Sequence, residues 1–294
     1  MCDGCYGGHP YACRTGGYGY GPGLLGLRSA WWTRDLSFFA GVHGFKGPPD
    51  RGRNGNFGIH EGINFGAPFG GPWGLGYQVG FNAVHSNFSG DQAYEYLRRA
   101  DRNQVFLTAG IFRRSLGGGF QWGVAFDLLH DNYYFGDSDL KQIRTESSYL
   151  FPSGLREIGY FGAYGTGDDN LILLGRDRYT SLEPTDMFAF YYRRYFVEGG
   201  DGRLWGGFTG RGDGLIGGDI RVPIGKSWAI ENRINYLIPK QGHGAGQAEE
   251  SWGLSLNLVW YVGAPSRCVD KSPFRPMFNV ADNTSFMSDA DGFH

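Results

Sequence analysis

The sequence has no long hydrophobic run, since no stretch approaches the roughly 18 apolar residues of a membrane-spanning helix. It does not open with a positively charged segment followed by an apolar stretch, so we expect any secretory signal to be removed or to lie outside this numbering. Only 19% of residues are charged, and a net charge of −2 with dispersed Lys and Arg argues against a nucleic-acid partner.

Motifs for catalysis or metal binding are equally scarce. The seven histidines show no H-x-x-x-H or H-x-H spacing, and no nucleophile elbow is present. The only clusters that suggest a hydrolase are His130 with Asp131 and Ser138, and His85 with Ser86. We therefore expect neither an enzyme nor a cofactor, and a hydrolase is the least favoured alternative.

Cysteine is absent from the whole middle of the chain. The four cysteines are Cys2, Cys5, Cys13 and Cys268, and a C-x-x-C without a second close pair is weak evidence for zinc. We favour two disulfides over a metal site, with at least one joining the N-terminal segment to Cys268. Three pairings are open, and the sequence does not choose among them.

What the chain has in abundance is glycine and aromatic residues: 52 Gly, 23 Phe, 18 Tyr and 8 Trp. Glycine forms helices poorly, whereas aromatic side chains suit a pleated surface. This combination predicts an all-β protein with many strands and tight turns. The low charge and the negative mean hydropathy of −0.35 are compatible with a membrane barrel, in which only every second residue faces lipid.

Residues 252–262 give the clearest strand pattern. One face carries Trp252, Leu254, Leu256, Leu258 and Trp260, while small and polar residues alternate with them. An apolar face with Trp at both ends is typical of a lipid-facing strand between two aromatic girdles. Similar alternation recurs in residues 75–83, 120–128, 188–193, 216–222 and 228–238.

The spacing of these segments predicts a transmembrane antiparallel up-and-down barrel of about 12 strands. Strands beginning near residues 36, 56, 73, 104, 119, 141, 157, 185, 202, 215, 228 and 251 would leave alternate links of about 5 residues, the others mostly much longer. We expect a Cys-rich extension in 1–34, the barrel in 35–263 and a periplasmic tail in 264–294. Glu61 falls among apolar positions of the second strand, where a bulge would restore the register.

Several strings resemble a family of planctomycete proteins of unassigned function: GNFGIHEGINFG (55–66), SNFSGD (86–91), QIRTESSY (142–149), RLWGGFTGRGDGLIGGD (203–219), ESWGLSLNLVWY (250–261) and SPFRPMFNVADNTSF (272–286). Together they span most of the chain from about residue 39 onward. The resemblance implies an outer-membrane setting, and it implies no reaction, ligand or catalytic residue.

Polar residues of the inward register would line the lumen and set ion or solute preference. They are Gln78, Asn82, Gln121, Asp127, Arg144, Glu146, Arg193, Asp219, Arg221, Glu231, Arg233 and Asn257. We favour a narrow or partly plugged porin-like channel, and the alternative is a structural or surface-assembly barrel filled by mutual salt bridges. The mixed lining predicts weak selectivity, which Arg233→Glu should shift toward cations.

The aromatic-rich tail is expected either to fold back into the lumen as a plug or to bind a periplasmic partner. An even strand count would place both termini in the periplasm. Outer-membrane lipid is then the main contact of the protein, with a homo-oligomer or a partner held by the tail as further candidates.

Overall fold

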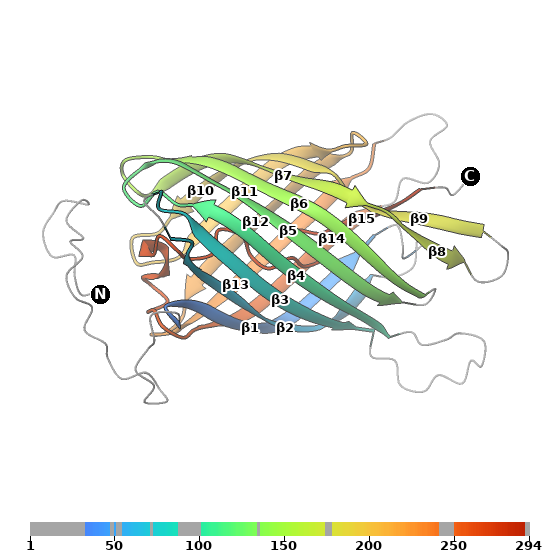
Figure 1. Ribbon diagram of the computed structural model, residues 1–294, viewed down its shortest axis with the longest axis horizontal. Coiled ribbons are helices and arrows are strands. Elements are labelled where there is room, and N and C mark those ends of the chain that lie inside the picture. Colours follow the sequence, from blue (N-terminus) through green and yellow to red (C-terminus); the bar gives the residue numbers. More distant parts are fainter. Residues whose placement is uncertain are drawn as a thin grey trace, which may run out of the picture.

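The computed structural model describes residues 33–47, 50, 55–70, 73–87, 101–133, 136–173, 178–240 and 250–291. Twelve antiparallel strands form a closed barrel in which successive wall strands pair, β7 pairs with β10 across an intervening hairpin, and β1 closes on β14 (Figure 1). The wall consists of β1 (Asp35–Lys46), β2 (Asn56–Pro68), β3 (Gly76–Ser86), β4 (Arg102–Arg113), β5 (Gly119–Tyr133), β6 (Gly136–Leu150), β7 (Arg156–Gly167), β10 (Met187–Tyr195), β11 (Asp201–Thr209), β12 (Gly214–Pro223), β13 (Trp228–Ile238) and β14 (Ser251–Tyr261).

The predicted fold class is confirmed, and most strands begin close to the expected residues. Two regions differ. β5 and β6 have 15 residues each, so much of the long loop expected between them is strand. The long link before β10 contains a hairpin, β8 (Asp169–Leu173) and β9 (Arg178–Pro184), which the sequence pattern did not reveal because these strands are short and extend beyond the wall.

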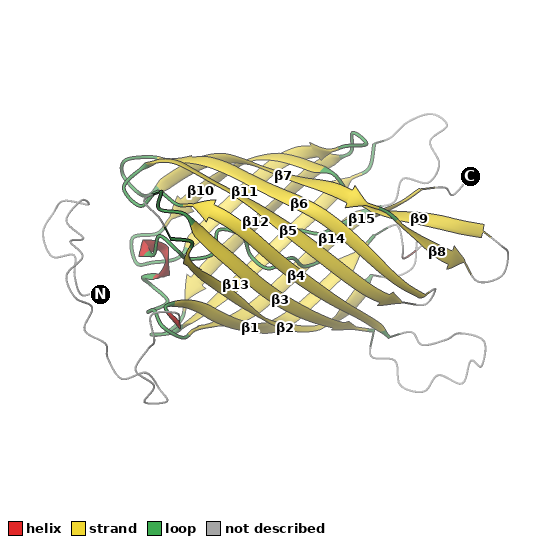
Figure 2. Ribbon diagram, in the orientation of Figure 1, coloured by secondary structure: helices red, strands yellow, loops and turns green. Residues whose placement is uncertain are grey.

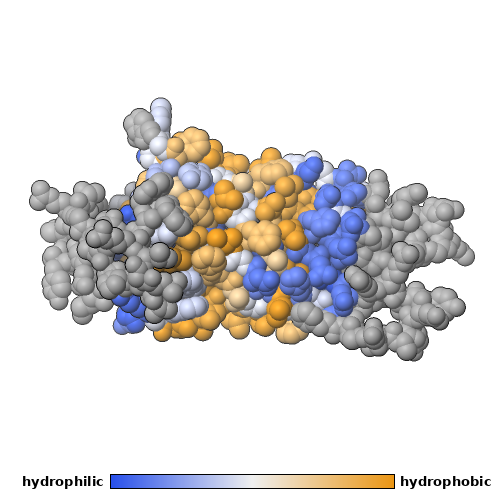
Figure 3. All heavy atoms as spheres, turned by 60° about the horizontal axis from the view of Figure 1, so that its bottom comes forward, coloured by the Kyte–Doolittle hydropathy of each residue, from blue (hydrophilic) through white to orange (hydrophobic). Residues whose placement is uncertain are grey.

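The outer face of the wall is apolar. On the face drawn in Figure 3, hydrophobic residues form a band across the middle of the barrel, with hydrophilic residues toward the end where β8 and β9 project. Phe57, Phe190 and Leu204, for example, have more than 60% of their surface exposed. Among the described residues, no helix is long and apolar enough to cross a membrane.

Glu61 breaks the apolar pattern without a bulge. The register of β2 with β1 and with β3 is continuous, so no bulge is present at this position and Glu61 points outward. Its carboxylate lies 3.5 Å from the ring of His85, and the same ring contacts the side chain of Asn103. The register shift in the described wall lies instead between β6 and β7, at Lys141 and Gln142.

The tail, described through residue 291, threads the barrel. We call the end where β1 begins the turn end and the opposite end the loop end. A short 3-10 helix, η3 (Val269–Lys271), lies at the turn end, and β15 (Ser288–Asp291) pairs with β9 at the loop end (Figure 2). The described part of the tail therefore runs from one end of the barrel to the other, and the side of the membrane on which each chain terminus lies stays a prediction.

Candidate functional site

The inner face of the wall carries all twelve polar residues that were expected to line the lumen. Nine of them are buried, and Asp219, Glu231 and Asn257 are half-buried. They are enclosed because the tail occupies the space in front of them. The candidate site is thus the lumen together with the tail that fills it.

One side of the lumen, formed by β2 to β6, meets the tail mostly with neutral amides, although Arg144 of β6 also donates to the carbonyl of Asn279 at 3.0 Å. We call this side the amide wall, and it consists of Asn64, Gln78, Asn82, Gln104 and Gln142. Gln78 is central to it: its amide group donates to the carbonyl of Phe278 at 3.0 Å, and its side-chain oxygen accepts from the backbone N–H groups of Met277 and Phe278 at 2.9 Å. A single glutamine thereby satisfies both kinds of backbone group.

The same pattern continues toward the loop end. Asn82 donates to the carbonyl of Ala281 at 3.1 Å, while the Thr108 hydroxyl accepts from the N–H of Ala281 at 2.9 Å. Farther along, Gln104 accepts from the Asn283 side chain at 2.8 Å. Buried backbone groups need such partners, so these side chains substitute for the strand neighbours that the tail lacks inside the barrel.

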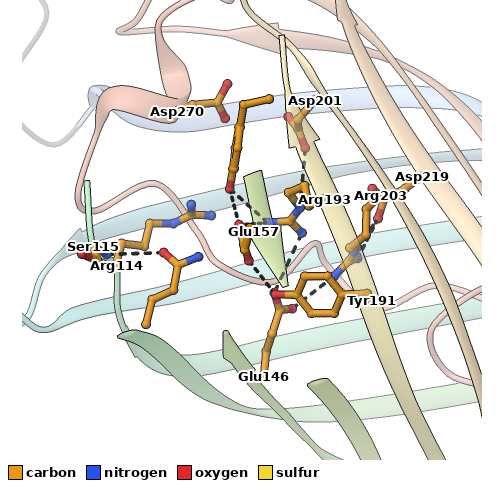
Figure 4. Close-up of polar contacts among 12 residues, drawn as sticks. Arg114, Ser115, Glu146, Glu157, Tyr191, Arg193, Asp201, Arg203, Asp219 and Asp270 are labelled. Atoms are coloured by element: carbon orange, nitrogen blue, oxygen red, sulfur yellow. Dashed lines mark hydrogen bonds and ion pairs between the residues drawn. The ribbon is translucent and has the colours of Figure 1, made fainter. Parts of the chain in front are cut away.

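The opposite side is charged. We call it the ionic wall, and it consists of Glu157, Arg193, Asp201, Arg203, Asp219, Arg221 and Arg233 on β7 and β10 to β13. Figure 4 labels the first five of these residues. Glu157 is fully buried and accepts hydrogen bonds from the hydroxyl groups of Tyr191 and Tyr195, both at 2.6 Å. Arg193 lies 3.6 Å from the same carboxylate.

Three aspartates of the tail pair with arginines of the barrel. Arg221 binds Asp270 near η3, and it also donates to Asp201 on the neighbouring strand at 3.0 Å. Arg233 lies 3.3 Å from Asp282 in the middle of the lumen. At the loop end Arg211 lies 2.9 Å from Asp289. In each pair the barrel supplies the cation and the tail the anion.

Arg275 forms an ion pair within the tail, with Asp270 near its start. The pair joins its guanidinium to the carboxylate of Asp270 and fixes the turn-end part of the tail.

Inward-facing glycines give the tail its room. A Cβ on Gly253 would lie 2.5 Å from the carbonyl oxygen of Asn283, and one on Gly80 would lie 2.4 Å from a methyl group of Val280. Gly66 and Gly123 are in comparable contact with the tail. The glycines that the sequence places on the polar face thus fit the tail closely.

Space remains beside the tail. A cavity of about 100 Å³ lies along the ionic wall, and a second of about 50 Å³ lies nearer the turn end. Arg233, Glu231 and Asn257 line both. At the loop end, by contrast, Ala281 and Phe286 of the tail pack into an apolar cluster with Val84, Phe106 and other wall residues.

Several residues of the site escaped the sequence analysis. Asn64, Gln104, Thr108 and Gln142 bind the tail, Glu157, Asp201 and Arg203 bind other residues of the wall, and Asp270 and Asp282 belong to the tail. The wall residues among them lie on the inward face of β2, β4, β6, β7 and β11, so the period-two alternation extended to these strands would have found them. The two tail aspartates carry no such signal.

The clusters considered for hydrolysis are not assembled. His130 faces outward with Asp139 as its partner at 2.8 Å, whereas Asp131 and Ser138 are buried on the inner side. Ser86 likewise faces inward, where its hydroxyl lies 2.9 Å from His43, while His85 points outward. Within the described ranges, no group of three or more His, Cys, Asp or Glu could hold a metal ion.

Of the four cysteines, the structure describes only Cys268. Cys268 immediately precedes η3 at the turn end. Cys2, Cys5 and Cys13 lie outside the described residues, as does the rest of the extension 1–32. The disulfide pairing stays a prediction.

Comparison with solved structures finds barrels of low similarity. Outer membrane phospholipase A from Escherichia coli shows 9% identity and a TM-score of 0.42, over 77% of this chain and 90% of that chain. A FadL homologue from Pseudomonas aeruginosa shows 7% identity and a TM-score of 0.42, over 77% and 89%. An anion-selective porin from Comamonas acidovorans shows 10% identity and a TM-score of 0.32, over 76% and 98%.

The sequence matches none of the curated proteins. It does match a family model described as "Family of unknown function (DUF6666)" over residues 35–288. The matched region takes in the whole barrel and the tail as far as the start of β15. The chain belongs to this family of unknown function.

Proposed function

We propose that the protein is an outer-membrane barrel that is closed by its own C-terminal tail and passes ions or small solutes when the tail shifts. The observation that carries this proposal is the threaded tail itself, which is bound by hydrogen bonds and ion pairs with side chains on both sides of the lumen. A segment held by such contacts, with cavities along one side, can move without unfolding the wall.

The membrane placement rests on the outer face. An apolar band around a closed barrel has no burial partner in water, whereas lipid covers it and the closed sheet leaves no unpaired edge. The short turns would face the periplasm and the longer connections the exterior. The purified protein should need detergent and show heat-modifiable mobility, and monodisperse protein in detergent-free buffer would contradict the placement.

A permanently filled, structural barrel is the second candidate. The packing of Phe286 and Ala281 against the wall favours it, because moving them exposes apolar surface. The two candidates differ in one respect: a gated channel must release the tail from part of the wall, whereas a structural barrel keeps it in place.

A disulfide between wall and tail would distinguish the gated channel from the structural barrel. The Thr108 hydroxyl lies 2.9 Å from the N–H of Ala281, so Thr108→Cys with Ala281→Cys should form a bond between wall and tail. In planar bilayers we expect small openings from the native protein, silence from the oxidised double variant and recovery on reduction. The single variants are the controls. Silence of the native and the reduced protein alike would support the structural barrel and reject the channel.

A further inference from the structure

Two arginines of the barrel depend on the tail for their partners. Arg114 donates to the carbonyl oxygens of Arg275 and Pro276, both at 2.9 Å, and it makes no ion pair within the described residues. Arg233 has Asp282 as its one ion-pair partner in the same part of the chain. A guanidinium in an enclosed site is costly without an anion, so both would need a new partner once the tail moves.

The ionic wall already has unused hydrogen-bond donors beside the larger cavity. The Nε group of Arg233 and the hydroxyl of Ser255 are buried and have no protein partner. Arg233 and Ser255 are cross-strand neighbours on β13 and β14, and both line the cavity. Two convergent donors on neighbouring strands suit the oxygen atoms of a carboxylate or phosphate group.

The charged residues that line this cavity also favour an anionic ligand. Among its wall residues are six arginines and four carboxylates, and three of the carboxylates, Glu146, Asp201 and Asp219, already accept hydrogen bonds from arginines of the wall. Arg221 shares its charge between Asp201 and the tail residue Asp270. Arg144 and Arg193 have the wall carboxylates Asp127 and Glu157 as partners, so departure of the tail with Asp270 and Asp282 would remove an anion only from Arg221 and Arg233.

We infer that the lumen beside the tail is an anion path, in which small carboxylate- or phosphate-bearing solutes bind Arg221 and Arg233 in place of the tail aspartates and Arg114 in place of the tail carbonyl groups. This inference rests on the proposed function, because a solute reaches these arginines only when the tail has shifted. The tail then acts as an internal competitor: its aspartates occupy the positions that the anionic groups of the solute would take.

The first test measures ion selectivity of the full chain in bilayers under a KCl gradient. We expect the native openings to favour Cl⁻ over K⁺, Arg233→Gln to lower that permeability ratio about threefold, and Asp282→Asn to raise it. Asp289→Asn, which removes a carboxylate that pairs with Arg211 at the loop end, is the matched control and should leave the ratio unchanged. Openings that favour K⁺, or that ignore Arg233→Gln, would overturn the anion path while leaving the tail-gated channel intact.

A second test needs no conduction. Asp282→Asn frees Arg233 in the full chain, so inorganic phosphate should raise the thermal unfolding temperature of this variant in detergent more than that of the native protein. The double variant Asp282→Asn with Arg233→Gln should lose the difference. An equal response of both variants to phosphate would reject anion binding at Arg233, even if every form of the protein proved silent in bilayers.

Discussion

The amide wall and the ionic wall hold the same tail by different chemistry. On the amide wall, neutral side chains such as Gln78 bind backbone groups directly. On the ionic wall, arginines such as Arg233 bind tail carboxylates, and a cavity remains beside them. An amide offers a donor and an acceptor without the cost of burying a charge, so it can pack closely, whereas charged groups need partners on several sides.

This difference suggests separate roles for the two sides. The amide wall sets the position and direction of the tail, because its hydrogen bonds fit the backbone residue by residue. The ionic wall borders the remaining space and carries the charges that a solute would meet. Variants of the ionic wall should therefore change the global stability of the protein. Variants of the amide wall should change the local protection of the tail against amide hydrogen exchange.

The largest effect is expected for Glu157→Ala. Its carboxylate is fully buried and accepts from two tyrosine hydroxyls beside Arg193. Its removal leaves a buried guanidinium short of its nearest anion, at a cost of about 3–5 kcal/mol. The loss should appear as a lower urea midpoint for the folded, heat-modifiable form. Glu157→Gln keeps the shape and part of the hydrogen bonding and should lose less; equal stability of Glu157→Ala and the native protein would show that the ionic wall contributes little.

Gln78→Ala tests the amide wall. It removes three hydrogen bonds to buried backbone groups of Met277 and Phe278, which should weaken tail binding by about 2–3 kcal/mol. We expect faster amide hydrogen exchange at Met277 and Phe278 with little change in the strands. Gln121→Ala is the matched control, because Gln121 is equally buried but accepts from Ser115 near the turn end at 3.4 Å. Similar exchange in both variants would contradict the positioning role.

Close contact between wall and tail gives a smaller effect. A Cβ on Gly253 would lie 2.5 Å from the carbonyl oxygen of Asn283, so Gly253→Ala should shift the tail and cost about 1–3 kcal/mol. More frequent openings in bilayers and faster exchange near Asn283 would be the measured result. Gly225→Ala, where nothing lies within 4 Å of the added atom, is the control. Unchanged exchange near Asn283 would mean that the tail is looser than the structure shows.

The barrel wall could be predicted from the sequence because the pattern that identifies a strand depends only on residues close together in the chain. Alternation of side chains between two faces identifies a strand, and Trp252 to Trp260 showed it clearly. The twelve inward residues followed from the same rule. Glu61 shows its limit: one charged residue on the outer face suggested a bulge, whereas a contact with His85 accounts for its position.

The position of the tail could not be predicted in this way. Its contacts join residues about 200 positions apart, such as Gln78 and Phe278, and no local pattern in the sequence identifies such pairs. The aromatic content of the tail suggested order but gave no direction through the barrel. The sequence analysis also missed the pairing of β15 with the hairpin of β8 and β9. This pairing requires the tail to cross the lumen, and the strand pattern did not predict that crossing.

The smallest effect is expected at the rim of the ionic side, where Arg211 contacts Glu183 and Asp289. The Arg211 side chain is 41% exposed, so water and salt screen the pairs, and Arg211→Gln should cost at most about 1 kcal/mol. We expect somewhat faster exchange at the N–H of Asp289, an effect that high salt should reproduce in the native protein. The buried pair of Arg233 and Asp282 should resist the same salt, because little solvent reaches it. If salt loosened both ends of the tail equally, the contrast between an exposed anchor and a buried one would be wrong.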